Sequence, residues 1–429
     1  MKKTLFIILA ASGLCASAQT SHPNHKVTPV NVLFSDEADS LKVYEALIEN
    51  SPADFHVPNA PRFAVVGKND KFYLGVGGTV KATMNYDWGS PIQNANEFGP
   101  YTIPMPGTSA YKPGNKGWFG ISAQQTDLFL NFVALPNNPN KIGFYINATL
   151  LGSGYAPQVR SAYVSYRGIE AGYGFSLFTD LAADPTTIDY DGPNSLTVSI
   201  NAKLDYRHYF GKHFGIGVGA EMPIASYTNA NKTSTVTQRI PDIPAYVQWN
   251  FGNNNRIRLS GLLRNMQYYD MLSQKTKNLA GWGVQLSGNF NICDKLIGYY
   301  QAAYGKGMSS YFQDLSGNSL DMVPNITNNG ELETVKAWGA YLGLQYNFSP
   351  KAYCTVLYSQ VRNYAPDYNG GTTPWVDQYK YGQYILGNFF YNINDLFTWG
   401  IEYIYGRRVN MDGLQAHDNR LQTMLQISF

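Results

Sequence analysis

The chain ends in Arg420-Leu421-Gln422-Thr423-Met424-Leu425-Gln426-Ile427-Ser428-Phe429, and this stretch decides the fold. Its residues alternate with a period of two, which places Leu421, Leu425 and Phe429 on one face of a β-strand and polar residues on the other. A terminal strand leaves a row of unpaired backbone amides unless another strand covers its free side. Pairing with the first strand closes a barrel, which has no edges. An ordinary buried strand of a soluble β-protein is the alternative for this stretch alone.

The beginning of the chain is typical of a secretory signal peptide. Lys2 and Lys3 precede the apolar run 5–11, and small residues follow up to Ala18, so we predict a signal peptide over residues 1–18. A transmembrane anchor needs about 20 apolar residues, and this run is too short. Cys15 follows Leu14, where a lipoprotein signal requires a small residue, which argues against lipidation. The protein is therefore expected to be exported.

The composition indicates a membrane β-barrel. The chain contains 33 Tyr, 22 Phe, 7 Trp and 41 Gly, and 14% of its residues are charged, against about 25% in soluble domains. No apolar run of transmembrane-helix length follows the signal peptide, whereas barrel strands alternate and dilute the hydropathy signal. The net charge of +2 points to no partner, and none of these features suggests nucleic acid. Cys293 and Cys354 are expected to be unpaired, because a strand separates them.

The mature chain divides into two parts. Residues 19–70 are predicted to form a periplasmic segment, with a short helix over 36–50 and a linker containing Pro52, Pro58 and Pro61. Residues 71–429 alternate as strands, and their turn signals divide them into about sixteen. One strand is predicted over 195–210, with Leu196 on its outer face, and another over 118–134. The predicted fold is an all-β transmembrane antiparallel barrel.

The lengths of the connections support a bacterial outer-membrane location. Short turns such as 211–212 and 293–294 alternate with long loops such as 88–117, 178–194 and 307–333. Outer-membrane barrels have short periplasmic turns and long extracellular loops. Membrane lipid, lipopolysaccharide and the barrel-assembly machinery are then the expected partners. A Phe at the end of an alternating strand is typical of the C-terminal signal for barrel assembly, and Phe429 is assigned that role.

One stretch carries a family resemblance. Gly172 to Phe178, Pro185 to Tyr190 and Gly192-Pro193 together resemble the DcaP-like trimeric porins, whose pattern is Gly-x-x-Trp-Ser-x-Phe, then Pro-x-Thr-x-Asp-Phe, then Gly-Pro. Phe175 stands for the family Trp and Tyr190 for the Phe. The resemblance implies a sixteen-stranded homotrimer for small hydrophilic solutes, with a preference for anions such as dicarboxylates. It also implies an inward-folded constriction loop, with the candidate residues Phe178, Asp180, Asp184, Pro185, Asp189, Asp191, Gly192 and Pro193.

Basic residues on the lumen face are the second set of candidates. Alternation places Lys81, Lys203, Arg207, Arg256, Arg258 and Arg264 inward, and the resemblance adds Arg160. Arginines along a pore wall form a lane for carboxylates. The alternative is that these charges are solvated, or paired with Asp205 and Glu221. Asp127 occupies a place where the family pattern predicts an arginine, which argues against strong anion preference.

The sequence does not indicate an enzyme. His208, His213 and His417 are isolated from any recognisable Ser or Cys nucleophile, and no cofactor or metal spacing occurs. Two alternatives to a passive porin remain. The first is an outer-membrane enzyme of the lipase type, which needs a Ser–His pair on the outer wall. The second is a structural or adhesive barrel with a plugged lumen.

Overall fold

The computed structural model describes residues 31–33, 40–52, 63–211, 213–228, 232–252, 255–325, 328, 330–366 and 378–429. The predicted signal peptide 1–18, the predicted helix start at 36 and the linker residues Pro58 and Pro61 lie outside the described residues. Most of the predicted loop 365–375 does so as well.

The chain folds as a closed antiparallel β-barrel with sixteen strand positions, as predicted. The barrel strands are β3 (Phe72–Gly89), β4 (Gly117–Ser122), β5 (Asp127–Ala134), β6 (Ile142–Gly152), β7 (Ala156–Tyr166), β8 (Ile169–Phe175), β9 (Ile200–Phe210), β10 (Phe214–Glu221), β12 (Ile243–Phe251), β13 (Asn255–Asp270), β14 (Lys275–Cys293), β15 (Leu296–Lys306), β18 (Lys336–Ser349), β19 (Ala352–Asn363), β20 (Tyr379–Asn392), β21 (Phe397–Asn410) and β22 (Gln415–Ser428). β4 and β5 both pair with β3 and share one strand position. The predicted strand 118–134 is therefore interrupted at 123–126.

Shorter elements lie in the connections and near the N-terminus. They are β1 (Asn31–Leu33), α2 (Ser40–Asn50), β2 (Phe63–Val66), η1 (Lys68–Asp70), η2 (Pro100–Thr102), η3 (Ser153–Tyr155), η4 (Leu181–Ala183), β11 (Thr233–Thr235), η5 (Ser309–Tyr311), η6 (Gln313–Leu315), β16 (Met322–Asn325) and β17 (Glu331–Thr334). Among the described residues, no helix combines the length and the hydrophobicity that a membrane span requires.

The seam of the barrel lies between the first and last strands. β22 pairs with β3 from Ser428 opposite Thr79 to Asp418 opposite Gly89. At the end of the chain, the Phe429 amide donates to the Gly78 carbonyl at 3.0 Å, and the Gly78 amide donates to the Phe429 carbonyl at 2.8 Å. A side chain on Gly77 would collide with the Phe429 carbonyl, so glycine is required for this approach. Closure leaves neither strand with an open edge.

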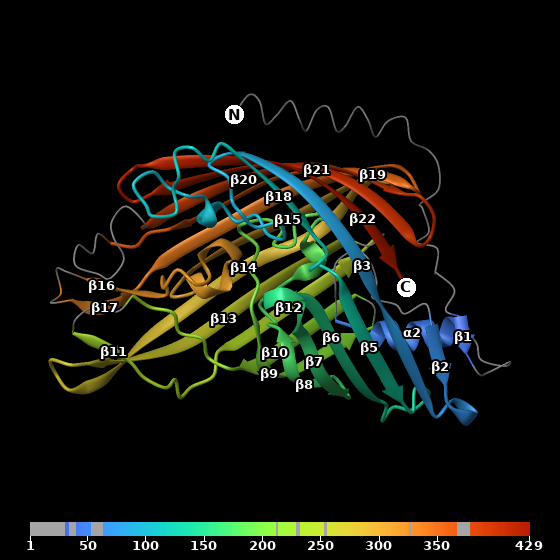
Figure 1. Cartoon of the computed structure of the whole chain (residues 1–429). Coiled ribbons are helices and arrows are strands. Elements are labelled where there is room, and N and C mark those ends of the chain that lie inside the picture. The colour runs from blue at the N-terminus through green and yellow to red at the C-terminus, as the bar shows by residue number, and fades with distance from the viewer. Residues whose placement is uncertain are drawn as a thin grey trace.

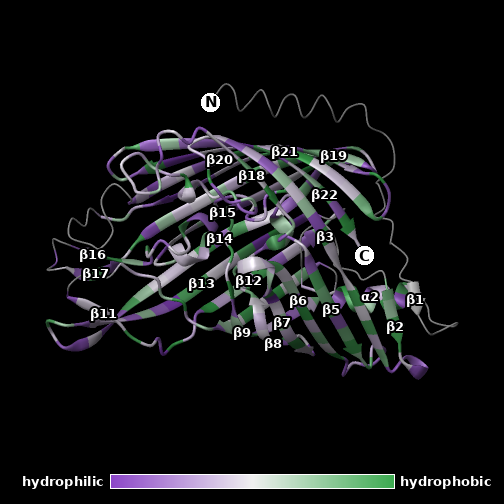
Figure 2. Cartoon of the chain, in the orientation of Figure 1, coloured by the Kyte–Doolittle hydropathy of each residue, from purple (hydrophilic) through white to green (hydrophobic). Residues whose placement is uncertain are grey.

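The side chains alternate between the membrane and the lumen along each strand. In β13, Leu259 and Leu263 are 53% and 65% exposed on the outer wall, while Arg258 and Arg264 point inward and are buried. Figure 2 shows this alternation as green and purple bands along the strands. A shift of one residue would turn both arginines toward lipid, at about 2–4 kcal/mol each near the midplane. The alternation fixes the register.

The predicted strand 195–210 begins five residues later than expected. β9 starts at Ile200, and residues 194–199 run inside the barrel instead of along its wall. Leu196, predicted to face outward, is 3% exposed and belongs to an internal cluster with Ile103 and Tyr341. The alternation of this stretch is correct, but the apolar face contacts other loops in the lumen.

The two ends of the barrel differ. Long connections such as 90–116, 176–199 and 307–335 lie at one end, and short turns such as 167–168 and 350–351 lie at the other. Figure 1 shows β11, β16 and β17 at the long-loop end, with α2, β1 and β2 at the opposite end. Chain termini and short turns mark the periplasmic side of an outer-membrane barrel.

The N-terminal segment is part of the barrel structure. β2, predicted as linker, pairs antiparallel with β3 at residues 73–76, and β1 pairs parallel with β2. α2 packs Val43 and Leu47 against Tyr73 and Val133, whose side chains face the lumen.

The last residue of α2 anchors the helix to the wall. The Asn50 side chain donates to Asn131 at 2.7 Å and accepts from Ser165 Oγ at 2.6 Å, and its carbonyl accepts from Tyr163. A side chain on Gly143 would overlap the Asn50 amide. The helix therefore lies on the inner wall at the periplasmic mouth.

Candidate functional site: inward loops and the charged lumen wall

The segment 176–199 between β8 and β9 folds into the lumen, and we call it the constriction segment. Its base is closed where the Ser176 amide donates to the Ser199 carbonyl at 2.8 Å. Most of the predicted constriction residues are buried, and the half-buried Asp191 is the exception. The buried members are Phe178, Asp180, Asp184, Pro185, Asp189, Gly192 and Pro193.

Asp180 joins the constriction segment to two of the predicted basic residues. Its carboxylate accepts hydrogen bonds from Arg256 and from Ser287 Oγ, the latter at 2.6 Å, and Arg258 Nη1 lies 3.7 Å away. Burial alone would raise the pKa of Asp180, but the two guanidinium groups and Ser287 outweigh it, so the pKa is lowered. This aspartate compensates one of the two positive charges of Arg256 and Arg258, so the group keeps a net positive charge.

The tip of the constriction segment is held by a carboxylate on the wall. Glu402 of β21 accepts from the backbone amides of Ile188 and Asp189, each at 2.9 Å. Asp189 in turn accepts from the Phe98 amide at 3.0 Å and from the Tyr384 hydroxyl at 2.9 Å. Burial, followed by the nearby Glu402 charge, raises the pKa of Asp189 to about 7. The tip is fixed to the wall and to the neighbouring loop 90–116.

Lys81 and Arg160 approach the constriction segment from the wall of early strands. Lys81 Nζ donates to the Ile188 carbonyl at 2.9 Å. Arg160 sits at a β-bulge in β7, and its guanidinium lies 5.2 Å from the ring centres of both Phe175 and Tyr190. Both basic side chains are half-buried. They are the candidates that retain partial exposure next to the tip.

Lys203 and Arg207 are paired with one carboxylate on their own strand, β9, and one on the neighbouring strand β8. Lys203 Nζ lies 2.7 Å from both Glu170 and Asp205. Arg207 lies 3.5 Å and 3.7 Å from the same two residues. Pairing with Asp205 was the predicted alternative to a solute lane, and the ion pairs favour it for these two residues.

Arg264 holds loops to the wall. It contacts Asp242 at 3.0 Å and Asp321 at 3.1 Å, and donates to the Gly307 carbonyl at 2.6 Å. Its side chain has no exposed surface. Arg264 faces the lumen, as predicted, but its guanidinium is enclosed and does not line an open surface.

The sequence reasoning missed two further loops inside the barrel. Loop 90–116 is anchored by Arg420, which donates to both carboxylate oxygens of Asp87 at 2.8 Å and to the Asn94 carbonyl at 2.6 Å. Arg408 likewise donates to the carbonyls of Tyr101 and Ile103. The signal was present, because Arg408 and Arg420 fall on the lumen face of alternating strands.

Loop 307–335 is the second missed loop. Phe312 and Leu315 pack against Ala337 and Val361, which face inward from β18 and β19. The apolar residues of this loop did not predict that it folds into the barrel, because apolar residues occur equally in a strand or in an interface with a partner. Three inward loops, instead of one, narrow the lumen.

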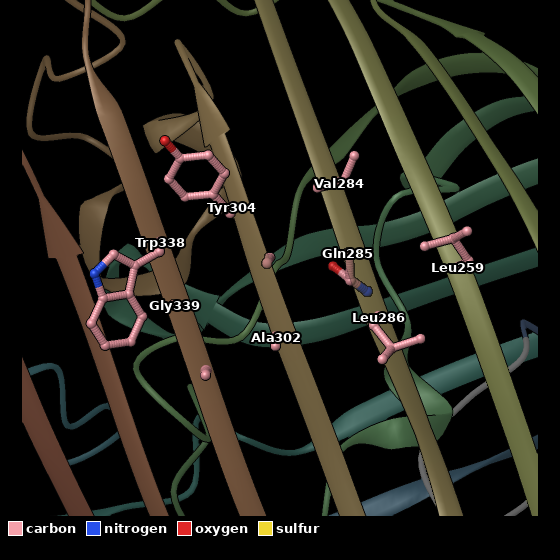
Figure 3. Close-up of a pocket in the computed structure, with 10 residues that line it drawn as sticks. Leu259, Val284, Gln285, Leu286, Ala302, Tyr304, Trp338 and Gly339 are labelled. Carbon is pink, nitrogen blue, oxygen red and sulfur yellow. The ribbon is translucent and has the colours of Figure 1, made fainter.

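Metal-binding clusters, cysteines and a groove on the outer wall bear on the alternatives to a channel. No three His, Cys, Asp or Glu side chains among them gather in a way that could hold a metal ion. Cys293 and Cys354 are both free. A shallow apolar groove runs along the outer wall, where Leu259, Leu286, Tyr304 and Trp338 surround Ala302 (Figure 3). Its lining lacks the Ser–His pair that a lipase-type barrel requires.

Comparisons with known proteins agree with this geometry. A family model described as a porin subfamily matches residues 141–420. Among solved structures, the chain resembles the outer-membrane channel DcaP of Acinetobacter baumannii, with a TM-score of 0.69 and 21% identity over 85% of this chain and 99% of that one. It also resembles OmpT of Vibrio cholerae (TM-score 0.51, 11% identity, 85% and 100% coverage). A third is an anion-selective porin from Comamonas acidovorans (0.50, 12%, 83% and 100%). No curated protein matches significantly.

Proposed function

Because this chain belongs to the Porin_2 family, a porin subfamily of outer-membrane channels, we propose that it conducts small hydrophilic solutes passively and favours anions such as dicarboxylates. The fold is that of the outer-membrane channel DcaP, as the sequence resemblance predicted. The location in the bacterial outer membrane follows from family and fold together.

The anion preference is supported by how the charges of the constriction segment are used. Asp180, Asp184 and Asp189 are buried, and the first and last of them accept hydrogen bonds from the wall or a neighbouring loop. Lys81 and Arg160 are half-buried beside the segment. A passing solute therefore meets Lys81 and Arg160 more readily than these three aspartates, whereas Asp191 is half-buried like the two basic residues. Charges that face a narrow passage act on a solute within the screening distance of about 8 Å.

Ion selectivity tests this proposal directly. In a planar bilayer, the wild-type channel should give stepwise ohmic conductance, with a reversal potential in a salt gradient that indicates anion preference. Replacing Lys81 and Arg160 together by Gln should shift the reversal potential toward cations, with total conductance reduced by less than half. Replacing the exposed Lys275 by Gln is the matched control and should leave the potential unchanged. An unchanged potential in the double variant would refute the assignment of preference to these two residues.

A second candidate function is a structural barrel with a plugged lumen. The observation that favours it is the packing of loops 90–116, 176–199 and 307–335 into a common interior. A folded wild-type protein that gives no conductance would support this function and reject the porin. If the wild-type protein conducts ions without any added partner, the plugged barrel is rejected.

We also propose a homotrimer assembled through the early strands, and recognition of Phe429 by the assembly machinery. The support for the second is geometric, because Phe429 completes the seam with Gly78. Deleting Phe429 should reduce the heat-resistant folded fraction in membranes more than it reduces refolding in detergent. Equal losses in both would contradict a role in recognition.

A further inference from the structure

The constriction segment is paired along its length with a second loop. The Val198 amide donates to the Tyr311 carbonyl at 2.8 Å, and the Gln313 amide donates to the Leu196 carbonyl at 2.9 Å. Between them, Thr197 and Phe312 form an antiparallel bridge. Residues 311–314, where η5 passes into η6, therefore run beside 194–198 and pair with them through one β-bridge and its flanking hydrogen bonds, and we call them the filter strand.

Side chains strengthen this pairing. Gln313 donates to Asp191 Oδ1 at 2.6 Å, and the Tyr311 ring packs edge-on against Phe178 at 5.9 Å between ring centres. Tyr311 and Phe178 are both essentially fully buried. The facing sides of the two loops therefore shield each other from solvent.

One carboxylate connects the filter strand to three other parts of the lumen. Asp314 accepts from the Tyr101 amide of loop 90–116 at 2.8 Å, from Asn194 Nδ2 of the constriction segment at 3.2 Å, and from the Tyr379 hydroxyl of β20. Asp314 is 4% exposed. A buried carboxylate with three donors fixes the relative positions of the groups that bind it.

We propose that the size filter of this channel is a composite of the constriction segment and the filter strand, fastened by Asp314. This inference rests on the proposed function. It assigns loop 307–335 a role in selecting solutes by size, and it makes Asp314 a positioning residue that acts through Asn194 and Tyr101. A channel constricted by one loop would have no such dependence on loop 307–335.

The test is liposome swelling with neutral sugars of increasing size, which reports bore without charge. Replacing Asp314 by Ala removes the acceptor from three buried donors, so the filter strand should separate from the constriction segment more often. Permeation of the smallest sugar that the wild type excludes should rise roughly tenfold, as expected for losing a buried hydrogen-bonded acceptor. Permeation of the smallest sugar in the series, which the wild type admits, should change by less than a factor of two.

Three further variants make the result specific. Asp314→Asn retains an acceptor and should restore most of the wild-type size limit. Gln313→Ala leaves Asp314 in place and should raise permeation of the excluded sugar less than Asp314→Ala does. If Asp314→Ala fails to fold, Gln313→Ala serves as the test instead. Ser316→Ala, at an exposed position of the same loop, should match the wild type. Heat-resistant migration on gels verifies that each variant is folded.

The outcomes separate this inference from the proposed function. If the wild type admits no sugar, both the porin and the composite filter are rejected. If the wild type shows a graded size limit that Asp314→Ala and Gln313→Ala leave unchanged, the porin stands and the composite filter is overturned.

Discussion

At the scale of single residues, Arg264 illustrates how a lumen charge serves structure. Replacing Arg264 by Ala leaves Asp242 and Asp321 buried without their common partner, and such a loss costs about 3–5 kcal/mol. We expect the temperature at which the folded band disappears on gels to fall clearly in this variant. The exposed Arg239, replaced by Ala, is the control and should have no effect. Normal heat resistance together with a changed reversal potential would show that Arg264 acts on solutes instead.

Two aspartates in the inward loops predict a dependence on pH. Burial raises the pKa of Asp189 to about 7 and that of Asp314 to about 6. Because the folded structure favours their protonated forms, their contribution to loop stability is complete only below the ordinary carboxyl pKa of about 4. It is lost as the pH rises through 6 to 7. Asp180 does not follow this trend, because its pKa is lowered.

We therefore expect fewer conductance fluctuations at pH 5 than at pH 8. The charged and titratable groups that face these two carboxylates are Glu402, Tyr384, Arg420, Lys81, Asp191, Tyr379 and Arg408. The double variant Asp189→Asn and Asp314→Asn should show few fluctuations at both pH values, since neither amide titrates. If the fluctuations of the double variant still depend on pH, the pH dependence comes from other groups.

At the scale of elements, α2 is the part whose role the sequence described least well. Its helical spacing predicted the helix, whereas its place on the inner wall depends on Asn131, Tyr163 and Ser165, which are distant in the sequence. Removing residues 19–66 should leave a folded, heat-resistant barrel, because the remaining strands satisfy their own backbone hydrogen bonds. Single-channel conductance should increase, because the periplasmic mouth loses a helix.

A point substitution provides the matched experiment for α2. Gly143→Val should displace Asn50 and expose the helix to protease cleavage, with the barrel intact. Val at Ala148, on the outer face of the same strand, should leave α2 protected. A helix that stays protected in Gly143→Val would contradict the docking described here.

At the scale of the whole molecule, the barrel wall is uneven. β5 and β8 contain eight and seven residues, while β13 and β14 contain 16 and 19. A strand needs about 9–11 residues to cross the hydrocarbon layer. β5 and β8 fall below this length, while β6 and β7 between them reach it with 11 residues each. The two short strands are therefore better suited to contact with another protein, which supports a trimer interface that includes β5 and β8.

A pair of charge substitutions tests this interface. Val164→Arg on β7 should release folded monomers, detected by native mass measurement in mild detergent. Leu259→Arg, on the long wall, should instead lower the yield of folded barrel by the cost of placing a charge in lipid. Both residues are exposed in the isolated chain, at 48% and 53%. A trimer that survives Val164→Arg would place the interface elsewhere.

The sequence determined the barrel well because alternation, turn chemistry and loop length are local signals. The inward phase of Arg256, Arg258 and Arg264 was predictable for the same reason. The lumen was not, because the partners of Asp180, Asp314 and Arg420 come from segments far apart in the chain. Apolar residues such as Leu196 and Phe312 pack against each other in the interior, and no periodicity distinguishes that from a membrane-facing strand.

The closing seam has a practical consequence for anyone who modifies the protein. β2 occupies the place beside β3 at residues 73–76, directly beyond the point where Phe429 ends. An affinity tag fused to the carboxyl end would run into β2 and compete for the same backbone partners. The exposed turn 271–274 between β13 and β14 has no such conflict, so handles for purification or labelling belong there.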